Sequence, residues 1–402
     1  MIYFSNLSLV NFRNYEQLDL TLEPGMVLIE GANGQGKSNI IEALNLISIG
    51  KSLRTSTENE LVRWQKPSTI DTYTTLSATV EQNSGPQKIQ IAFKIPSSNT
   101  NVPEDIEMES YRSSRISQKF YKINGVSTQP YQLVGKVPTV TFTSQNLDIV
   151  LGNPSDRRRY LDILISQFDR NYLKAVQQYR HTVIQRNHLL RAIAENRSNI
   201  LELEFWDKSL IEHGQYIMIA RSKAIKSLSP TVNRVYRDLS NNKETLELSY
   251  EPNIDPSNKF SDSVCGEIFM EKISINRNRD LTQKHTTTGP HRDEMSVTLQ
   301  GMSAAKYASR GQIRTAVLSL KLAEAIKIEQ ERDQMPVLLL DDFLSELDKK
   351  RRDQLFEHIS KYHQSFTTTA DLETIDRSHL PRMSRFTVRL GEITRGTHLT
   401  ES

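Results

Sequence analysis

"Gly31-Ala32-Asn33-Gly34-Gln35-Gly36-Lys37-Ser38" is the stretch that decides the fold of this chain. It follows the apolar run 26–29 and precedes the helix-forming run 39–44, so the predicted order is strand, glycine-rich loop, helix. A phosphate-binding P-loop requires this context, because glycines let successive backbone N–H groups point at an anion and the helix start adds partial positive charge. The alternative, a chance glycine-rich turn, is disfavoured by the complete match and by both flanks.

The residue types in this loop predict a nucleotide site that takes ATP and Mg²⁺. We expect the backbone of Gly31, Ala32, Asn33, Gly34, Gln35 and Gly36 to surround the phosphates. Lys37 can reach the β- and γ-phosphates, and the Ser38 hydroxyl can ligate Mg²⁺. Nucleotide hydrolysis needs positioned donors and a metal more than covalent chemistry, so Lys37 is also a candidate catalytic residue.

A second motif lies near the other end of the chain. The run 335–340 is apolar and ends in Asp341 and Asp342, as a buried parallel strand with a Walker B carboxylate does. Asp341 is expected to hold Mg²⁺ together with Ser38. Asp342 stands where ABC enzymes usually carry a catalytic glutamate, and its side chain is one methylene shorter. The shorter reach toward the attacking water predicts slow hydrolysis.

A third motif, Ala308-Ser309-Arg310-Gly311-Gln312, precedes the helical run 313–328. A serine at the start of a helix offers hydroxyl and backbone N–H donors to an anion. Taken singly, this turn could be an ordinary helix start and the two aspartates an ordinary strand end. In this order, the three motifs predict an α/β fold: an ABC-type P-loop ATPase head with mixed β-sheets, split by a mainly helical insertion.

The chain then resembles the RecF family of bacterial recombination-mediator ATPases, which is related to the SMC heads. Besides the three motifs, the stretches that carry the resemblance are 11–15 (NFRNY), 51–55 (KSLRT), 152–162 (GNPSDRRRYLD), 289–294 (GPHRDE) and 345–348 (SELD).

The resemblance implies an ATP-driven homodimer that clamps DNA at gaps and helps to load recombinase onto single strands. ATP hydrolysis would be a slow release switch, and RecR and RecO would be partners. By the same resemblance, Ser309, Arg310 and Gly311 face the nucleotide held by the other subunit, and Arg13 approaches the nucleotide.

Two features of the ATPase pattern are less definite in this chain. Gln145 stands where the Q-loop glutamine of ABC enzymes falls and is a catalytic candidate, although a surface glutamine fits equally well. The histidine expected after the strand that follows Walker B is missing. Thr368, Thr369 and Asp371 occupy that region, so the sequence does not identify the residue that senses the γ-phosphate.

Composition narrows the classes of protein that the chain can belong to. No part of the 402 residues approaches the roughly 18 uninterrupted apolar residues of a membrane span. The first residues lack the pattern of a secretory signal. Cys265 is the single cysteine, which excludes an intrachain disulfide and indicates a cytoplasmic protein without a membrane partner.

We predict a discontinuous head, residues 1–150 and 286–402, and a helical arm, residues 151–285. The apolar spacing predicts one helix from Ser155 of about 40 residues, on the order of 60 Å long. A second helix over 205–228 stops near Pro230, with helical character fading after Leu239, and strands are expected at 245–250 and 295–299.

The charge of the arm is uneven along its length. Residues 151–200 hold nine basic and four acidic side chains, although the whole chain has a net charge of only +3. Arg157, Arg158 and Arg159 are therefore candidate DNA contacts, with a solvated helix face as the alternative.

Two other classes of P-loop protein compete with this prediction. An energy-coupling ATPase of a membrane transporter shares the three motifs, but usually has the glutamate and the histidine that this chain lacks. A small-molecule kinase or metabolic ATPase has no need for the Ser-Arg-Gly-Gln turn.

Overall fold

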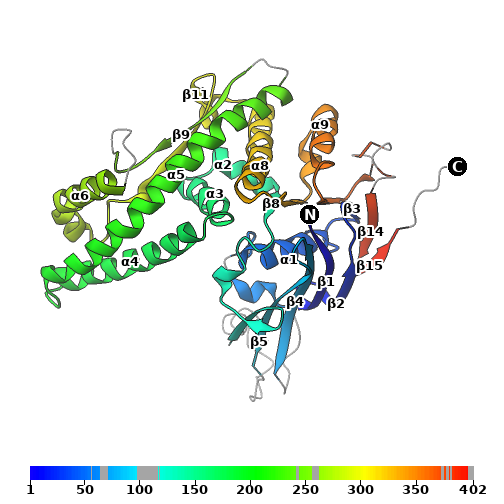
Figure 1. Cartoon of the computed structure of the whole chain (residues 1–402), viewed down its shortest axis with the longest axis horizontal. Coiled ribbons are helices and arrows are strands. Elements are labelled where there is room, and N and C mark those ends of the chain that lie inside the picture. Colours follow the sequence, from blue (N-terminus) through cyan, green and yellow to red (C-terminus); the bar gives the residue numbers. More distant parts are fainter. Residues whose placement is uncertain are drawn as a thin grey trace, which may run out of the picture. The chain divides into compact units, whose positions relative to one another are not determined.

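The computed structural model describes residues 1–55, 57–63, 71–96, 116, 118–240, 244–255, 262–372, 375–376, 380 and 383–396. Two compact units account for the chain (Figure 1). The first comprises Met1–Ser144 and Ile328–Ser402, and the second comprises Gln145–Lys327.

The first unit contains a six-stranded sheet that carries the nucleotide motifs. Its strand order is β15-β14-β3-β13-β12-β8, with β15 antiparallel and the other strands parallel. The strands are β3 (Gly25–Glu30), β8 (Thr139–Phe142), β12 (Val337–Leu340), β13 (Gln364–Thr369), β14 (Met383–Arg389) and β15 (Glu392–Arg395). Strands β8, β12 and β13 are buried along their whole length. This burial explains the apolar and β-branched residues of β8 and β12 and of the run 366–369 in β13.

A second six-stranded sheet of this unit is antiparallel, in the order β2-β1-β4-β5-β6-β7. Its strands are β1 (Ile2–Phe12), β2 (Tyr15–Thr21), β4 (Thr72–Gln82), β5 (Gln87–Ile95), β6 (Gln118–Ile123) and β7 (Val126–Ser127). Buried and exposed residues alternate along β4 and β5, as the polar and apolar alternation of residues 87–94 predicts.

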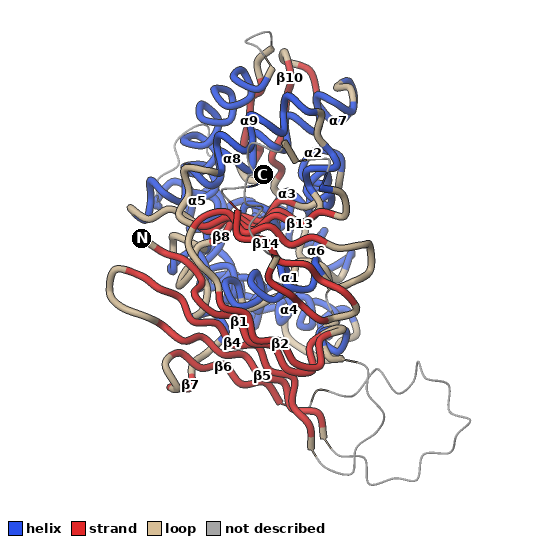
Figure 2. The backbone as a smooth tube through the Cα atoms, turned by 90° about the vertical axis from the view of Figure 1, so that its right-hand side faces the viewer, coloured by secondary structure: helices blue, strands red, loops and turns tan. Residues whose placement is uncertain are grey.

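Helix α1 (Lys37–Ile49) joins the two sheets into one core (Figure 2). Ile40 and Leu44 of α1 are fully buried in a single apolar cluster. That cluster also contains Leu76 of the antiparallel sheet and Leu339 of the parallel one. The helix that follows the P-loop is thus fixed from both sides. Helix α9 (Lys349–Ile359) and the short 3₁₀ helices η1 (Glu58–Leu61), η3 (Pro130–Gln132) and η7 (Phe343–Glu346) complete the unit.

The second unit is mainly helical. Its helices are α2 (Asp148–Leu151), α3 (Pro154–Ser166), α4 (Arg170–Ala194), α5 (Leu203–Leu239), α6 (Asp262–Gln283), α7 (Ala304–Tyr307) and most of α8 (Arg310–Arg332), with 3₁₀ turns η4 (Ser144–Leu147), η5 (Ile200–Glu202) and η6 (Pro290–Arg292). A three-stranded antiparallel sheet, β11-β10-β9, contributes β9 (Leu246–Glu251), β10 (Glu294–Leu299) and β11 (Met302–Ser303). Helices α4, α5 and α6 contact one another, and β9 packs along α5.

The single 40-residue helix predicted from Ser155 is wrong, because the structure contains α3 and α4 instead. Asn153, not Ser155, caps α3, through a reciprocal capping box with Asp156. The chain breaks at residues 167–169, and Asp169 starts α4 by accepting a hydrogen bond from the Tyr172 amide. Asparagine and aspartate are strong N-cap residues. They determine where α3 and α4 begin, although the apolar spacing continues without a break.

The predicted stop near Pro230 is also wrong, since α5 continues through it to Leu239. Proline lacks an N–H and leaves the carbonyl four residues earlier unpaired. Pro230 lies on the exposed side of α5, where water can satisfy that carbonyl. On the other side Leu228 and Val232 are fully buried, so packing holds the helix together.

Helix α6 and strand β15 are among the elements that were not predicted. The contacts also place residues 286–327 in the helical unit, so the second boundary lies at 328 and not at the predicted 286. The pairing of β10 with β9 keeps residues 294–299 within the helical unit.

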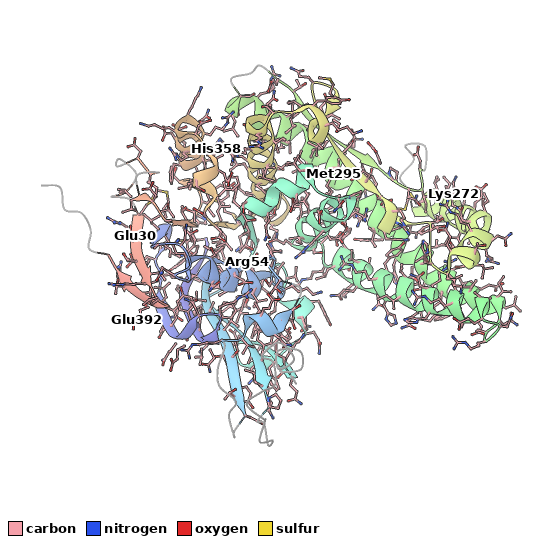
Figure 3. The ribbon with its side chains drawn as sticks, turned by 180° about the vertical axis from the view of Figure 1, so that it is seen from behind. Glu30, Arg54, Lys272, Met295, His358 and Glu392 are labelled. Carbon is pink, nitrogen blue, oxygen red and sulfur yellow. The ribbon has the colours of Figure 1, made fainter. Side chains whose placement is uncertain are left out.

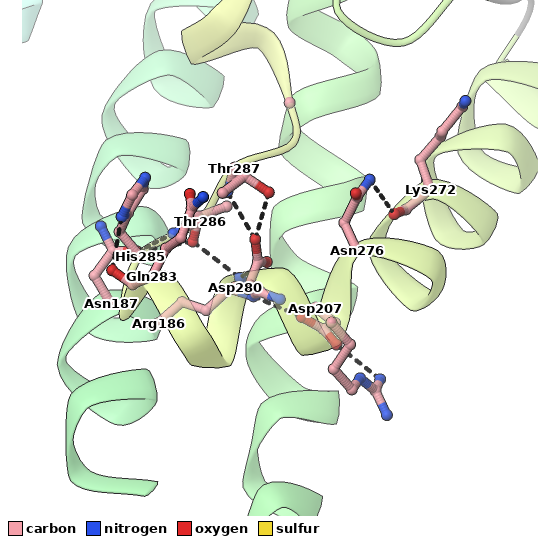
Figure 4. Close-up of polar contacts among 12 residues, drawn as sticks. Arg186, Asn187, Asp207, Lys272, Asn276, Asp280, Gln283, His285, Thr286 and Thr287 are labelled. Atoms are coloured by element: carbon pink, nitrogen blue, oxygen red, sulfur yellow. Dashed lines mark hydrogen bonds and ion pairs between the residues drawn. The ribbon is translucent and has the colours of Figure 1, made fainter. Parts of the chain in front are cut away.

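A buried polar cluster ties the three long helices of this unit to the segment before β10 (Figure 4). Arg186 of α4 is fully buried and donates to Asp207 of α5 and to Asp280 of α6, each over 2.7 Å. Asp280 in turn accepts hydrogen bonds from the amide and hydroxyl of Thr287. Removal of one partner from a buried ion pair is strongly destabilising. The cluster therefore holds the three helices in one arrangement.

Candidate nucleotide site

The P-loop is shaped by two glycines that no other residue could replace without strain. Gly31 and Gly36 have φ angles of 151° and 118°, in the region that favours glycine. A Cβ on Gly31 would lie 2.4 Å from the carbonyl oxygen of Val388, and one on Gly36 would lie 2.5 Å from Nδ2 of Asn14. A Cβ on Gly34 would meet no atom within 4 Å, so its side of the loop is open. The loop is closely packed at Gly31 and Gly36 and open at Gly34.

The Lys37 ammonium is folded over this loop. Its Nζ donates to the carbonyl oxygens of Gly31 and Ala32, over 2.7 and 3.0 Å. Burial lowers the pKa of Lys37, while the carboxylates of Asp342 and Asp341 raise it. Lys37 is therefore within electrostatic range of both Walker B aspartates, as the sequence predicts.

The Walker B carboxylates lie at the end of β12, next to the end of β13. The amide of Asp341 donates to the carbonyl of Phe142, which continues the pairing of β12 with β8. The Thr368 hydroxyl of β13 donates to Oδ1 of Asp341 over 3.0 Å and accepts from the Asp342 amide over 2.8 Å. One hydroxyl thus orients both members of the aspartate pair. Sequence reasoning noted Thr368 only as the replacement of a missing histidine.

Asp342 has an unusual backbone and an unusual charge environment. Its φ of 49° places a non-glycine residue in the left-handed region, which costs energy and turns its side chain out of the strand direction. Desolvation raises the pKa of the Asp342 carboxyl, and Lys37 opposes that rise while Asp341 adds to it. Such a carboxyl is a weaker acid than usual, a property that a proton acceptor near an attacking water needs.

The donor set matches a triphosphate with Mg²⁺. The ammonium of Lys37 lies over the loop, and the Ser38 hydroxyl belongs to the first turn of the 13-residue α1, whose N-terminus follows the loop. The described residues contain no group of three or more metal-binding side chains. Mg²⁺ is usually held by one or two protein oxygens together with phosphates and water, so Ser38 and Asp341 stay its candidate ligands.

Arg13, predicted to approach the nucleotide, is engaged with a buried carboxylate in this structure. Its Nε and Nη2 donate to the two oxygens of Glu42, over 2.9 and 2.8 Å, and Nη1 donates to the Glu60 carbonyl. Ser52 also donates to Glu42, and the guanidinium of Arg54 lies 3.7 Å from it. Arg54 is labelled in Figure 3. The arrangement ties the turn after β1 to α1. Contact between Arg13 and a nucleotide stays a prediction.

Sequence reasoning missed the residues that support the loop from outside. Tyr15 donates its hydroxyl hydrogen to the Gly36 carbonyl over 3.0 Å, and Asn14 donates to the Gln35 carbonyl over 2.8 Å. The Gln35 side chain accepts from the amide of Leu390, in the turn between β14 and β15. The NFRNY stretch already contained Asn14 and Tyr15, but their partners could not be read without the fold.

The third motif, residues 308–312, is called the signature turn from here on. It belongs to the second unit and starts α8. Ser309 and Gln312 form a reciprocal capping box: the Ser309 amide donates to Oε1 of Gln312, and the Gln312 amide donates to Oγ of Ser309. Ser309, Arg310 and Gly311 are all exposed. The predicted turn at a helix N-terminus is present, and it lies on the surface of the unit.

Gln145 lies in η4 and is exposed, three residues after β8. β8 pairs with β12 in parallel, so the chain leaves the sheet beside the Walker B strand. Gln145 is also the first residue of the second unit. Its part in catalysis stays a prediction.

The three candidate DNA-binding arginines of α3 have different environments. Arg157 donates from Nε and Nη2 to both oxygens of Glu294, over 2.6 and 2.7 Å. Arg158 donates to the Asp293 carbonyl over 2.8 Å. Arg159 is exposed. The geometry favours a structural role for Arg157 and Arg158, which fasten α3 to the start of β10.

The fold and this site define the class of protein: an SMC-like, ABC-type ATPase head with a P-loop, a Walker B strand and a signature turn. The predicted α/β fold class is confirmed. None of the described helices has the length and apolar character to span a membrane.

Comparison with known proteins gives the family. Residues 3–389 match the family described as RecF/RecN/SMC N terminal domain. The chain is 32% identical to the DNA replication and repair protein RecF of Chloroflexus aurantiacus, over 98% of the chain and 100% of that protein. It is 33% identical to the RecF of Alkaliphilus oremlandii, over 96% and 98%. The chain belongs to the RecF family.

Solved structures support the same family assignment. A structure described as the recombination mediator protein RecF-ATPrS in the RecFOR pathway superposes with a TM-score of 0.85, at 30% identity, over 98% of both chains. The Smc head domain of Pyrococcus furiosus, at 15% identity and a TM-score of 0.53, shares the fold.

Proposed function

We propose that this chain is an ATP-dependent DNA-binding protein of recombinational repair and replication maintenance. The observation that carries the proposal is the Lys37, Asp341 and Asp342 constellation around a glycine-shaped loop, in a chain of the RecF family. Relatives with this fold include structures described as RecF-ATPrS and RecF-ATP, which supports ATP as the ligand.

In the ATP complex, Lys37 and the loop N–H groups hold the phosphates. Ser38 and Asp341 hold Mg²⁺, whose charge would offset that of the phosphates. Thr368 keeps the Asp341 carboxylate oriented. Release of Lys37 from the Gly31 and Ala32 carbonyls frees its donors for phosphate oxygens.

Hydrolysis is proposed to be slow, so that it acts as a release switch. Asp342 is the candidate base for the attacking water, and Gln145 is the candidate that orients this water. The short side chain of Asp342 argues for a low turnover number. Steady-state turnover with and without DNA tests this, since vigorous DNA-independent hydrolysis contradicts a switch.

Assembly is proposed to be an ATP-driven homodimer. Ser309, Arg310 and Gly311 form an exposed helix start that is suited to a phosphate held by a second copy. Sedimentation of Ser309→Arg with ATP tests this assembly. We expect the variant to remain monomeric where the wild type dimerises, and an equally tight dimer would remove the turn from the interface.

The DNA and partner assignments come from family membership. We propose that the dimer clamps DNA at gaps and assists recombinase loading, with RecR- and RecO-like proteins as partners. The RecFOR pathway described for the relative supports this.

A gel-shift assay on gapped, single-stranded and double-stranded DNA, with and without ATP, tests the whole proposal. The wild type should be retained with ATP, while Lys37→Met should not. Retention that ignores both ATP and Lys37 would contradict an ATP-dependent clamp.

A further inference from the structure

The outer face of the C-terminal half of α5 carries a row of basic side chains. Lys223, Lys226, Arg234 and Arg237 are all exposed. At 100° per residue these four positions fall within an arc of about 80°, and they extend over about 21 Å of helix. The segment from Lys223 to Arg237 contains no aspartate or glutamate. We call these four residues the α5 basic face.

This face lies opposite the packing face of the helix. Leu228, Val232, Val235 and Tyr236 are buried, and β9 packs along α5. The basic positions occupy the other side. Their charged groups therefore lie on the solvent-exposed surface of the unit and not in its core.

The four side chains also have no polar partner among the described residues. Within the described parts of the chain, no hydrogen bond or ion pair engages any of them. Arg157 and Arg158 differ in this respect, since their guanidinium groups are held by Glu294 and by the Asp293 carbonyl. Asp238, which follows Arg237 on α5, is an exposed acid with an interaction of its own. Glu247 and Glu251 are exposed acids of β9, the strand that packs along α5.

We propose that the α5 basic face binds the phosphate backbone of DNA. A row of unpaired cations without intervening acids complements a duplex, which carries about one negative charge per 1.7 Å of its axis. A row of about 21 Å matches roughly six base pairs at 3.4 Å each. The proposal rests on the proposed function, because it gives the DNA clamp a contact surface.

The chemistry of the α5 basic face disfavours a lipid surface or another protein as its partner. The described large apolar side chains that α5 exposes are Phe205 and Tyr216, both in its first half. A helix that binds a lipid surface needs an apolar face beside its basic one. Protein interfaces need buried aromatic or aliphatic anchors. The α5 basic face offers charge alone, as a contact to phosphates does.

The test uses two double variants of the full-length chain, Lys223→Gln with Lys226→Gln, and Arg234→Gln with Arg237→Gln. Glutamine keeps the helix propensity and most of the length of the side chain. The matched control is Lys272→Gln with Arg279→Gln, which removes two exposed charges from α6 of the same unit. Thermal unfolding shows whether each variant folds as the wild type does.

The measurement is fluorescence anisotropy of a labelled gapped duplex with ATP, over a series of salt concentrations. Each α5 variant should weaken binding about tenfold or more near 0.1 M salt and reduce the slope of log K against log salt by up to about 1.8. The control should keep the wild-type slope. Unchanged slopes in both α5 variants, or an equal loss in the control, would overturn the proposal. A wild type that does not bind DNA would defeat the proposed function itself, together with this inference.

Discussion

Nε2 of Gln312 donates a hydrogen bond to Oε1 of Glu244 over 2.6 Å, and the other oxygen of Glu244 accepts from the Tyr236 hydroxyl over 2.8 Å. Gln312 is the residue whose side chain caps the Ser309 amide. The signature turn is therefore held in place from the end of α5, the helix that carries the α5 basic face. Glu244 is a positioning residue in this arrangement.

Replacing Glu244 with alanine should weaken the proposed ATP-dependent dimer. Gln312 then loses its partner, and the capping box becomes less ordered at a cost of about 0.5–1 kcal/mol per turn. With two turns in each dimer, the dissociation constant should rise about fivefold to thirtyfold. Sedimentation with ATP measures this. Glu247→Ala, at an exposed position of β9, is the control and should dimerise normally. A dimer of wild-type strength in both variants would show that the capping box needs no support.

Thr368→Val should reduce ATP turnover without disrupting the core. Valine has nearly the shape of threonine but cannot bond to Asp341 or accept from the Asp342 amide, and a lost buried partner costs about 1–3 kcal/mol. We expect a drop in kcat of about tenfold or more, measured in a steady-state assay with Mg²⁺. Thr368→Ser restores the hydroxyl and should recover most of the activity. Failure of serine to rescue would show that the methyl group, and not the hydroxyl, is what matters.

Arg157→Ala should destabilise the protein and leave the salt dependence of DNA binding unchanged. Arg157 makes two hydrogen bonds to Glu294 across 137 residues of sequence, and Glu294 would lose both. The loss of free energy of unfolding should be about 1–3 kcal/mol, measured by urea unfolding. Lys174→Ala removes an exposed charge from α4 of the same unit and should have little effect on stability. If Arg157→Ala lowered the salt slope while keeping full stability, Arg157 would be a DNA contact after all.

The sequence was sufficient for the parts of the site that are local. The P-loop, the strand before Asp341 and the turn at Ser309 each lie in one short segment whose period and residue types determine their structure. The roles of Thr368, Glu244 and Tyr15 were not predictable, because each depends on a partner brought close by the fold. The break between α3 and α4 was missed because the apolar spacing continues across it, and only Asp169, the N-cap of α4, marks it.

The last prediction concerns His291, whose surroundings hold it neutral. Its Nε2 lies 3.0 Å from the Thr286 carbonyl, which can only accept, so Nε2 carries the proton. Nδ1 then accepts from the Tyr179 hydroxyl over 2.7 Å. Burial lowers the pKa of His291 from 6.5 to about 4.

A pKa that is lower in the folded state gives stability that is fully present above pH 6.5 and is lost as the pH falls toward 4. Between pH 7.5 and 5.0 the loss from this one group should be about 2 kcal/mol. His291→Gln should be less stable at pH 7.5 but lose less on acidification, as measured by urea unfolding followed by circular dichroism. His188→Gln, an exposed position of α4, should show the wild-type dependence on pH. If His291→Gln lost as much stability as the wild type on acidification, protonation of another group would have to account for the loss.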